Sequence, residues 1–165
     1  MARRKNVKGC EEFSALLNGL SGYAVVEVMR GACYAGAGAL AEAVNNEINN
    51  LPVQHGYMKD KQKRNVIGAH DKRMLSERLG ISRIDSTGDR ASVAVGFDGY
   101  NDRPTKKYPK GVPIALIARS IESGSSVREK NPFMRRAYNN AKTQVQQKML
   151  DAGQKLLNDK IKQGG

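Results

Sequence analysis

The chain is predicted to be an α+β protein, in which a small antiparallel β-sheet is packed with two long helices and extended loops. Apolar residues recur at helical spacing over two segments, about 22–50 and 131–162, and this spacing predicts the two helices. Between them, SVAVGF at residues 92–97 alternates larger apolar with small residues, which is the pattern of a half-buried strand. A length of 165 residues is about that of one domain.

The N-terminal third is expected to be helical after a basic start. Residues 1–8 are interpreted as a flexible basic arm, with a single domain over 9–165, and EEFSALLNGL at 11–20 predicts a short helix. The long helix that follows ends before Pro52, because the residue preceding a proline is pushed out of the α region. Within it, GACYAGAGAL at 31–40 lacks the Lys and Ser/Thr of a phosphate loop, so Gly31 and Gly38 are expected to let another backbone approach closely.

The middle of the chain is predicted to hold a hairpin between two long loops, 53–70 and 98–112. A short helix is expected at about 71–79, then strands in ISRID (81–85) and SVAVGF, joined by turn chemistry at 85–89. We expect the sheet to exceed two strands, because an isolated hairpin is marginally stable. A helix from Pro113 to about Ser123 follows, and Asn131 with Pro132 is predicted to cap and open the final helix.

Positive charge is the strongest global property of the chain. Twenty-eight Lys and Arg against 16 Asp and Glu give a net charge of +12, spread over residues 3–8, 59–78, 103–110 and 128–136. Such groups attract phosphates and acidic protein surfaces alike, so charge alone does not select a partner. A solvated basic surface with a disordered arm is the alternative that needs no partner.

The residues that usually carry chemistry are few. His55 and His70 lie in expected loops without metal-ligand spacing, and are interpreted as solvated. Cys10 and Cys33 have no CxxC spacing, so neither a disulfide framework nor structural zinc is predicted, and a reducing compartment fits best. We therefore predict a protein that is not an enzyme, with no catalytic residue, cofactor or metal. No apolar run approaches the ~20 residues of a membrane span, and no secretory signal is recognised at the basic start.

Nucleic-acid binding stays open at this stage. Tyr57, Tyr100 and Tyr108 lie among basic residues, an interleaving used by proteins that stack on single strands. No recognition helix or other known nucleic-acid-binding signature accompanies them. Salt-sensitive contact with backbone phosphates is therefore the form of binding that the sequence allows.

One segment, VAVGFDGYNDRPTKKYPKGVPIALIARSIESGSSVREKNPFMRRAY at residues 93–138, has a distinctive order of short motifs. Its landmarks are Gly96-Phe97-Asp98-Gly99-Tyr100, Tyr108-Pro109, Ala118-Arg119-Ser120-Ile121-Glu122-Ser123-Gly124-Ser125 and Pro132-Phe133-Met134-Arg135. In this order the chain resembles a family of minor tail or neck proteins of lambda-like tailed phages, over roughly residues 22–160.

The resemblance implies a virion protein without enzymatic activity that joins the DNA-filled head to the tail. It implies a cyclic homo-oligomer, six- or twelve-fold, flanked by head-closure and tail-terminator proteins, with non-specific contact to genomic DNA in the lumen. The expected location is the head–tail junction, and the host cytoplasm during assembly. Two alternatives remain: a basic nucleic-acid-binding accessory protein, and an assembly factor that leaves before maturation.

Candidate interface residues come from the two loops and the segment before the last helix. Gly124 is expected to permit a sharp turn, basic residues of 128–136 to meet an acidic neighbour, and Phe133 to anchor the helix, with an ordinary core position as the alternative for Phe133. The full set is Tyr57, Lys59, Lys61, Arg64, Tyr100, Lys106, Lys107, Tyr108, Gly124, Arg128, Phe133 and Arg136.

Overall fold

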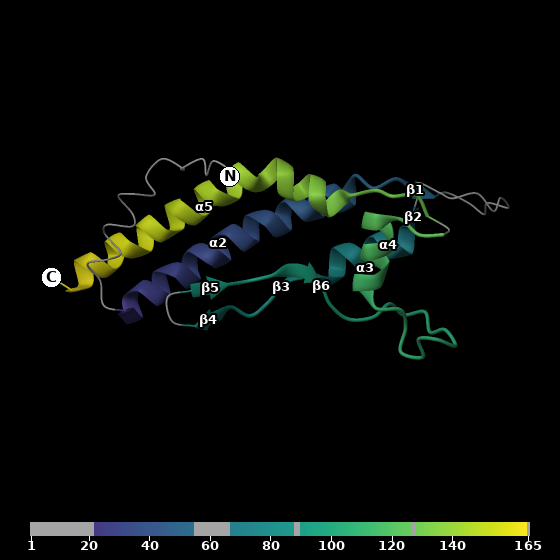
Figure 1. Ribbon diagram of the computed structural model, residues 1–165, viewed down its shortest axis with the longest axis horizontal. Helices are drawn as coiled ribbons and strands as arrows, with labels where there is room; N and C mark the ends of the chain where they lie inside the picture. The colour runs from purple at the N-terminus through teal and green to yellow at the C-terminus, as the bar shows by residue number, and fades with distance from the viewer. Residues whose placement is uncertain (1–21, 55–66, 88–89, 127, 165) are drawn as a thin grey trace, which may run out of the picture. The chain divides into compact units, whose positions relative to one another are not determined.

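The α+β class is confirmed by the computed structural model, which describes residues 22–54, 67–87, 90–126 and 128–164 (Figure 1). The expected basic arm 1–8 and short helix 11–20 lie outside these residues. The helices are α2 (Gly22–Asn49), α3 (Ala69–Arg78), α4 (Ile114–Ser123) and α5 (Phe133–Gly164). The strands are β1 (Val53–Gln54), β2 (Ile67–Gly68), β3 (Leu79–Ile81), β4 (Asp85–Thr87), β5 (Arg90–Ser92) and β6 (Val95–Phe97).

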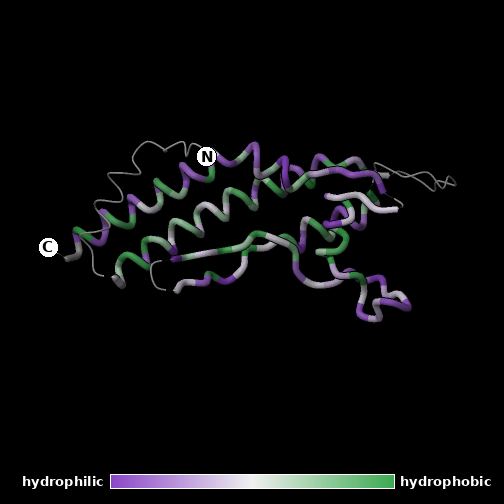
Figure 2. The backbone as a smooth tube through the Cα atoms, in the orientation of Figure 1, coloured by the Kyte–Doolittle hydropathy of each residue, from purple (hydrophilic) through white to green (hydrophobic). Residues whose placement is uncertain are grey.

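The described residues fall into two compact units, whereas the sequence predicts one domain over 9–165. The first unit contains residues 22–39, 82–87, 90–94 and 141–164, and the second contains 40–54, 67–81, 95–126 and 128–140. Both long helices therefore contribute residues to each unit. Figure 2 shows hydrophobic and hydrophilic stretches alternating along α2 and α5, as expected for helices with one buried side.

In the first unit, α2 and α5 pack closely through small residues. A Cβ atom added to Gly31 would collide with Leu156, and one added to Gly36 would collide with Met149. At Gly31 the sequence predicted the approach of another backbone, and the space is instead occupied by the side chain of Leu156. At Gly38 the prediction of close approach is wrong, because an added Cβ would have open space around it within the described part of the chain. Glycine lets the α5 side chains fill the space beside α2, which suits a chain that is short of large apolar residues.

The β4–β5 pair is held on the same unit by side chains of α2. The thiol of Cys33 donates to the carbonyl of Ala91 at 3.5 Å, and the hydroxyl of Tyr34 accepts from the amide of Ile84 at 3.3 Å. Residues 85–87, predicted as the beginning of a turn, instead pair antiparallel with 90–92, so that prediction is wrong. All three side chains of β4 are exposed. Its residues, Asp-Ser-Thr, show no alternation of apolar and polar side chains that would have predicted a strand.

The second unit has the main apolar core. It is built where α2, α3, α4 and the start of α5 meet, and its fully or nearly fully buried members are Val44, Ile48, Leu51, Ile67, Leu75, Ile114, Ile121, Phe133 and Ala137. The rings of Phe97 and Phe133 lie 6.2 Å apart at 53°, a tilted arrangement that suits the aromatic quadrupoles. The predicted helical face Ile114, Ile117 and Ile121 is buried in this core, as expected.

The sheets are smaller than predicted. In the second unit β3 pairs antiparallel with β6, which confirms the antiparallel orientation of the predicted hairpin. The same unit also contains the parallel pair β1–β2. Each sheet among the described residues has two strands, so the expectation of a larger sheet is wrong. Phe97 of β6 packs against the helical core, which supplies the support that a third strand would otherwise give.

Two boundaries differ from the predictions. Helix α3 begins at Ala69, within the segment predicted to be the loop 53–70, and strands β1 and β2 also lie in that segment.

None of the described helices is sufficiently long and apolar to cross a membrane.

Candidate interaction surface

The connection between α4 and α5 begins with a turn at Gly124. This residue has φ 78° and ψ 170°, a conformation essentially restricted to glycine. The turn is closed by two backbone hydrogen bonds, from the amide of Ser125 to the carbonyl of Arg128 at 2.9 Å and from Asn131 to Ile121 at 2.8 Å. The predicted sharp turn at Gly124 is confirmed, and its role here is within the chain.

Helix α5 is capped by a side chain from the preceding helix. The carboxylate of Glu122 accepts hydrogen bonds from the amides of Met134 at 2.9 Å and Arg135 at 3.3 Å. Asn131 was predicted to be the cap, and that prediction is wrong, because its Oδ1 is buried without a hydrogen-bond partner among the described residues. A carboxylate offers two acceptors, and its negative charge is stabilising near the positive end of the helix dipole.

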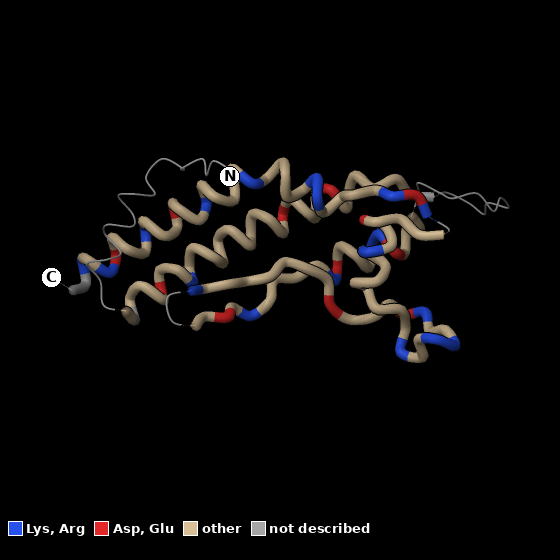
Figure 3. The backbone as a smooth tube through the Cα atoms, viewed as in Figure 1, with Lys and Arg blue, Asp and Glu red and all other residues tan. Residues whose placement is uncertain are grey.

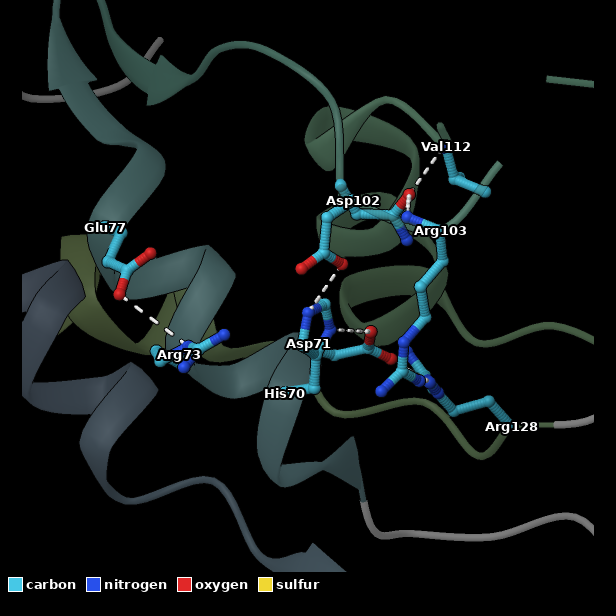
Figure 4. A network of polar contacts seen from close by, with 9 residues as sticks. His70, Asp71, Arg73, Glu77, Asp102, Arg103, Val112 and Arg128 are labelled. Atoms are coloured by element: carbon cyan, nitrogen blue, oxygen red, sulfur yellow. Dashed lines mark hydrogen bonds and ion pairs between the residues drawn. The ribbon is translucent and has the colours of Figure 1, made fainter. Parts of the chain in front are cut away.

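His70 links α3 to the loop 98–112. Its Nε2 lies 2.7 Å from the Asp102 carboxylate, and its Nδ1 lies 3.9 Å from that of Asp71 (Figure 4). The hydrogen bond from His70 is the main reason why the pKa of Asp102 is lowered. The interpretation of His70 as a solvated loop residue is wrong, since only 16% of its side chain is exposed and it lies in the first turn of α3. His55 lies outside the described residues.

Three of the predicted interface residues serve the fold of the second unit. Phe133 is fully buried, so the alternative of an ordinary core position is the one confirmed, and its assignment to an interface is wrong. Arg128 contacts Asp71 at 3.5 Å and donates to Ser120 at 3.2 Å. Arg136 pairs with Glu47 at 2.9 Å. Both arginines already form ion pairs within the unit, so an acidic neighbour would have to compete with Asp71 and Glu47 for them.

The loop 98–112 is fixed at its base by Asn101. This side chain is only 8% exposed, and its Oδ1 accepts from the amides of Val112 at 2.7 Å and Arg103 at 3.3 Å. Its backbone amide donates to the carbonyl of Val112 at 2.9 Å. Gly111 has φ 97°, and a Cβ there would collide with the carbonyl of Asn101. No pattern in the sequence predicted this closure, because Asn and Gly are common in any loop.

The end of the loop is closed by a second turn. The amides of Thr105 and Tyr108 each donate to the carbonyl of the other, at 3.0 and 3.1 Å, and Gly111 donates to Tyr108 at 3.0 Å. The ammonium of Lys107 lies 5.5 Å from the centre of the Tyr108 ring, a cation–π distance. The predicted loop is thus confirmed as lacking helix or strand, and its backbone is nevertheless well hydrogen-bonded. We call residues 101–112 the basic hairpin.

Of the predicted residues that the structure describes, Tyr100, Lys106, Lys107 and Arg136 are exposed, and the two lysines lie in the basic hairpin. Arg103, Lys106, Lys107 and Lys110 are exposed, Tyr108 is half-buried, and Tyr100 at the start of the loop is 51% exposed. Figure 3 shows the blue basic residues gathered at the end of this loop. Tyr57, Lys59, Lys61 and Arg64 lie outside the described residues.

The described residues include no cluster of three or more His, Cys, Asp and Glu side chains that would hold a metal ion. Comparison of the chain with protein-family models, curated proteins and solved structures gives no match. The candidate site is therefore defined by geometry: a closed basic hairpin, held to α3 by His70 and Asp102.

Proposed function

We propose that the protein is a structural component of a tailed-phage head–tail junction, where it assembles as a closed homo-oligomeric ring. The motif order of residues 93–138 motivates this proposal. Its landmarks form one structural module in the second unit: β6, the basic hairpin, α4, the Gly124 turn and the start of α5. Glu122 and Gly124 hold the two helices together, while the hairpin between β6 and α4 stays available to neighbours.

The observation that carries the proposal is this separation of roles within the resembling segment. Buried or paired landmark residues such as Ile121, Glu122 and Phe133 build a rigid support, and the exposed landmark residues of the same segment lie before and in the hairpin, on α4 and at Arg135 of α5. A module of this type suits a protein that works by contact. A connector on the axis of a tail needs head-to-tail interfaces that close into a ring, so each copy must present two different surfaces.

Exposed apolar side chains in the second unit are the candidate ring contacts. Tyr100 and Tyr138 are each 51% exposed, Ile81 is 40% exposed and Leu116 is 39% exposed. Leu116 lies in the first turn of α4, and Tyr100 pairs through its backbone with Pro113 just before that helix. Both side chains therefore flank the same end of α4, next to the basic hairpin.

Particle composition tests the proposal. Mass spectrometry of purified particles of the encoding phage should find the chain in several copies per tail, and electron microscopy of particles lacking the gene should show unjoined heads and tails. Absence from mature particles, with presence in infected cells, would support the departing assembly factor and contradict the structural role.

Substitution of an exposed apolar residue gives a sharper test. Leu116→Asp should leave the urea-unfolding midpoint close to the wild-type value while preventing incorporation into particles, because the side chain is at the surface of the isolated chain. Ala115→Asp, at the exposed neighbouring position, is the matched control for added negative charge. Incorporation of the Leu116 variant at wild-type level would remove this face of α4 from the ring contacts.

A further inference from the structure

We infer that the basic hairpin is a preorganised binding element for the phosphodiester backbone of nucleic acid. This inference goes beyond the structural role and does not require it, since a ring component and a free protein present the same hairpin. It rests on three properties of the hairpin: unpaired charge, a fixed backbone and the type of basic residue.

The end of the hairpin has an excess of positive charge. Residues 103–110 include four basic side chains, Arg103, Lys106, Lys107 and Lys110, and no acidic one. Within the described part of the chain, none of the four forms an ion pair, whereas Arg128 and Arg136 do. The nearest acid along the chain is Asp102, whose carboxylate lies 2.7 Å from His70 and also interacts electrostatically with Arg103. The hairpin thus presents a concentrated positive surface to solvent.

The backbone beneath these charges is fixed before any partner arrives. Asn101 and Gly111 close the base, and the reciprocal hydrogen bonds of Thr105 and Tyr108 close the end. Binding therefore orders side chains but not the loop itself. Preorganisation of this kind raises affinity because less conformational entropy is lost on binding.

The residue types favour phosphate over an acidic protein. Three of the four basic residues are lysines. Lysine is depleted from protein–protein interfaces, whereas its compact charge makes frequent contacts with nucleic-acid phosphates. Tyr108 is half-buried, and the ammonium of Lys107 lies over its ring, so the face on that side is not open to a base. The hairpin therefore fits the backbone rather than the bases, and binding should be independent of sequence.

The experiment measures binding of the full chain to a labelled 30-base-pair DNA duplex by fluorescence anisotropy at several salt concentrations. Four phosphate contacts predict a slope of log K against log salt of about −3.6 from the hairpin alone, or about a 150-fold loss of affinity between 50 and 200 mM salt. Lys106→Gln, Lys107→Gln and Lys110→Gln together should reduce the magnitude of the measured slope by about 2.7.

A matched variant controls for net charge. Lys142, Lys148 and Lys155 are exposed on α5, and their replacement by Gln removes the same charge elsewhere. This control should keep nearly the wild-type slope. Equal effects of the two triple variants would overturn the assignment to the hairpin, and so would a hairpin variant with unchanged affinity and slope.

A third variant separates backbone order from charge. Asn101→Ala retains all four basic residues but removes the acceptor of the Val112 and Arg103 amides. It should bind several-fold more weakly with an unchanged salt slope, and wild-type affinity would refute preorganisation. Circular dichroism confirms that the variant is folded, and the lysine variants test the charge without altering this buried side chain.

Polyglutamate of comparable length tests the other class of partner. Binding of polyglutamate as tight as that of the duplex would assign the hairpin to an acidic protein and overturn the inference. Failure of DNA binding leaves the particle composition unchanged, so it is distinguishable from failure of the proposed structural function.

Discussion

The capping of α5 by Glu122 gives a prediction whose magnitude follows from the contacts. Its carboxylate accepts from two backbone amides, Met134 at 2.9 Å and Arg135 at 3.3 Å, at the positive end of a 32-residue helix. A hydrogen bond to a charged group contributes about 1.5–3 kcal/mol when buried, but loss of a helix cap typically costs about 0.5–2 kcal/mol because water reaches the freed amides. Glu122 is only partly buried, so Glu122→Ala should lower the free energy of unfolding by about 1–2 kcal/mol.

Two further variants divide this effect into its parts. Glu122→Gln keeps an oxygen acceptor and loses the charge, so it should cost about 0.3–1 kcal/mol, the usual range for a charge at a helix terminus. Glu129→Ala is the control, since Glu129 is exposed in the same connection and should change stability little.

Urea unfolding followed by circular dichroism measures all three variants against the wild type. The comparison uses the transition midpoint at constant m-value, because a changed m-value indicates a different unfolded or native state. In thermal unfolding the Ala variant should melt about 2–8 °C lower, at about 2–4 °C per kcal/mol for a chain of this length. If Glu122→Ala and Glu129→Ala unfold at the same urea concentration, the cap does not stabilise α5 and the argument fails.

Three further predictions concern single side chains. Gly124→Ala should lower the free energy of unfolding by about 1–3 kcal/mol in urea unfolding, because alanine is strained at φ 78° and its Cβ would lie 3.1 Å from the amide of Lys130; a loss below 0.5 kcal/mol would contradict this. The hydrogen bond from His70 lowers the pKa of Asp102, so at acid pH the folded state binds fewer protons than the unfolded state. The contribution of Asp102 to the free energy of unfolding is therefore fully present above its ordinary pKa of 3.8, and it is lost as the pH falls through the lowered pKa of the folded state. Urea midpoints between pH 2.5 and 6 should fall less steeply in Asp102→Asn than in the wild type, and parallel acid limbs would refute the link. Burial raises the pKa of the Cys33 thiol, so in a Cys10→Ser background iodoacetamide at pH 7.5 should react more slowly with the folded chain than with the urea-unfolded chain; equal rates would contradict it.

The sequence was sufficient where local periodicity determines structure. The face Ile114, Ile117 and Ile121 repeats at helical spacing, and it is buried in α4 as predicted. The end of the first long helix was also predictable, because Pro52 excludes the α region for the residue before it. Both features depend on chemistry within a few residues.

The sequence was insufficient where structure depends on distant partners. Glu122 caps a helix that begins 11 positions later, at Phe133, and Asn131 stood at the position where a local rule places the cap. His70 looked like a loop residue because its partner Asp102 belongs to another loop. Strand β4 has three exposed side chains, so its pairing with β5 left no hydrophobic alternation to detect. In each case the deciding contact forms only after the chain has folded back on itself.

The distribution of ion pairs distinguishes two kinds of basic residue in this chain. Arg128 and Arg136 were grouped with Lys106 and Lys107 as interface candidates, because a sequence shows charge but not its neighbours. In the folded unit the arginines meet Asp71 and Glu47, so an external anion would have to displace a carboxylate. The hairpin lysines have no ion-pair partner among the described residues, so an external anion meets no such competition there. If charge alone governed binding, replacing the arginines would weaken it as much as replacing the lysines; if pairing governs it, only the lysines should matter.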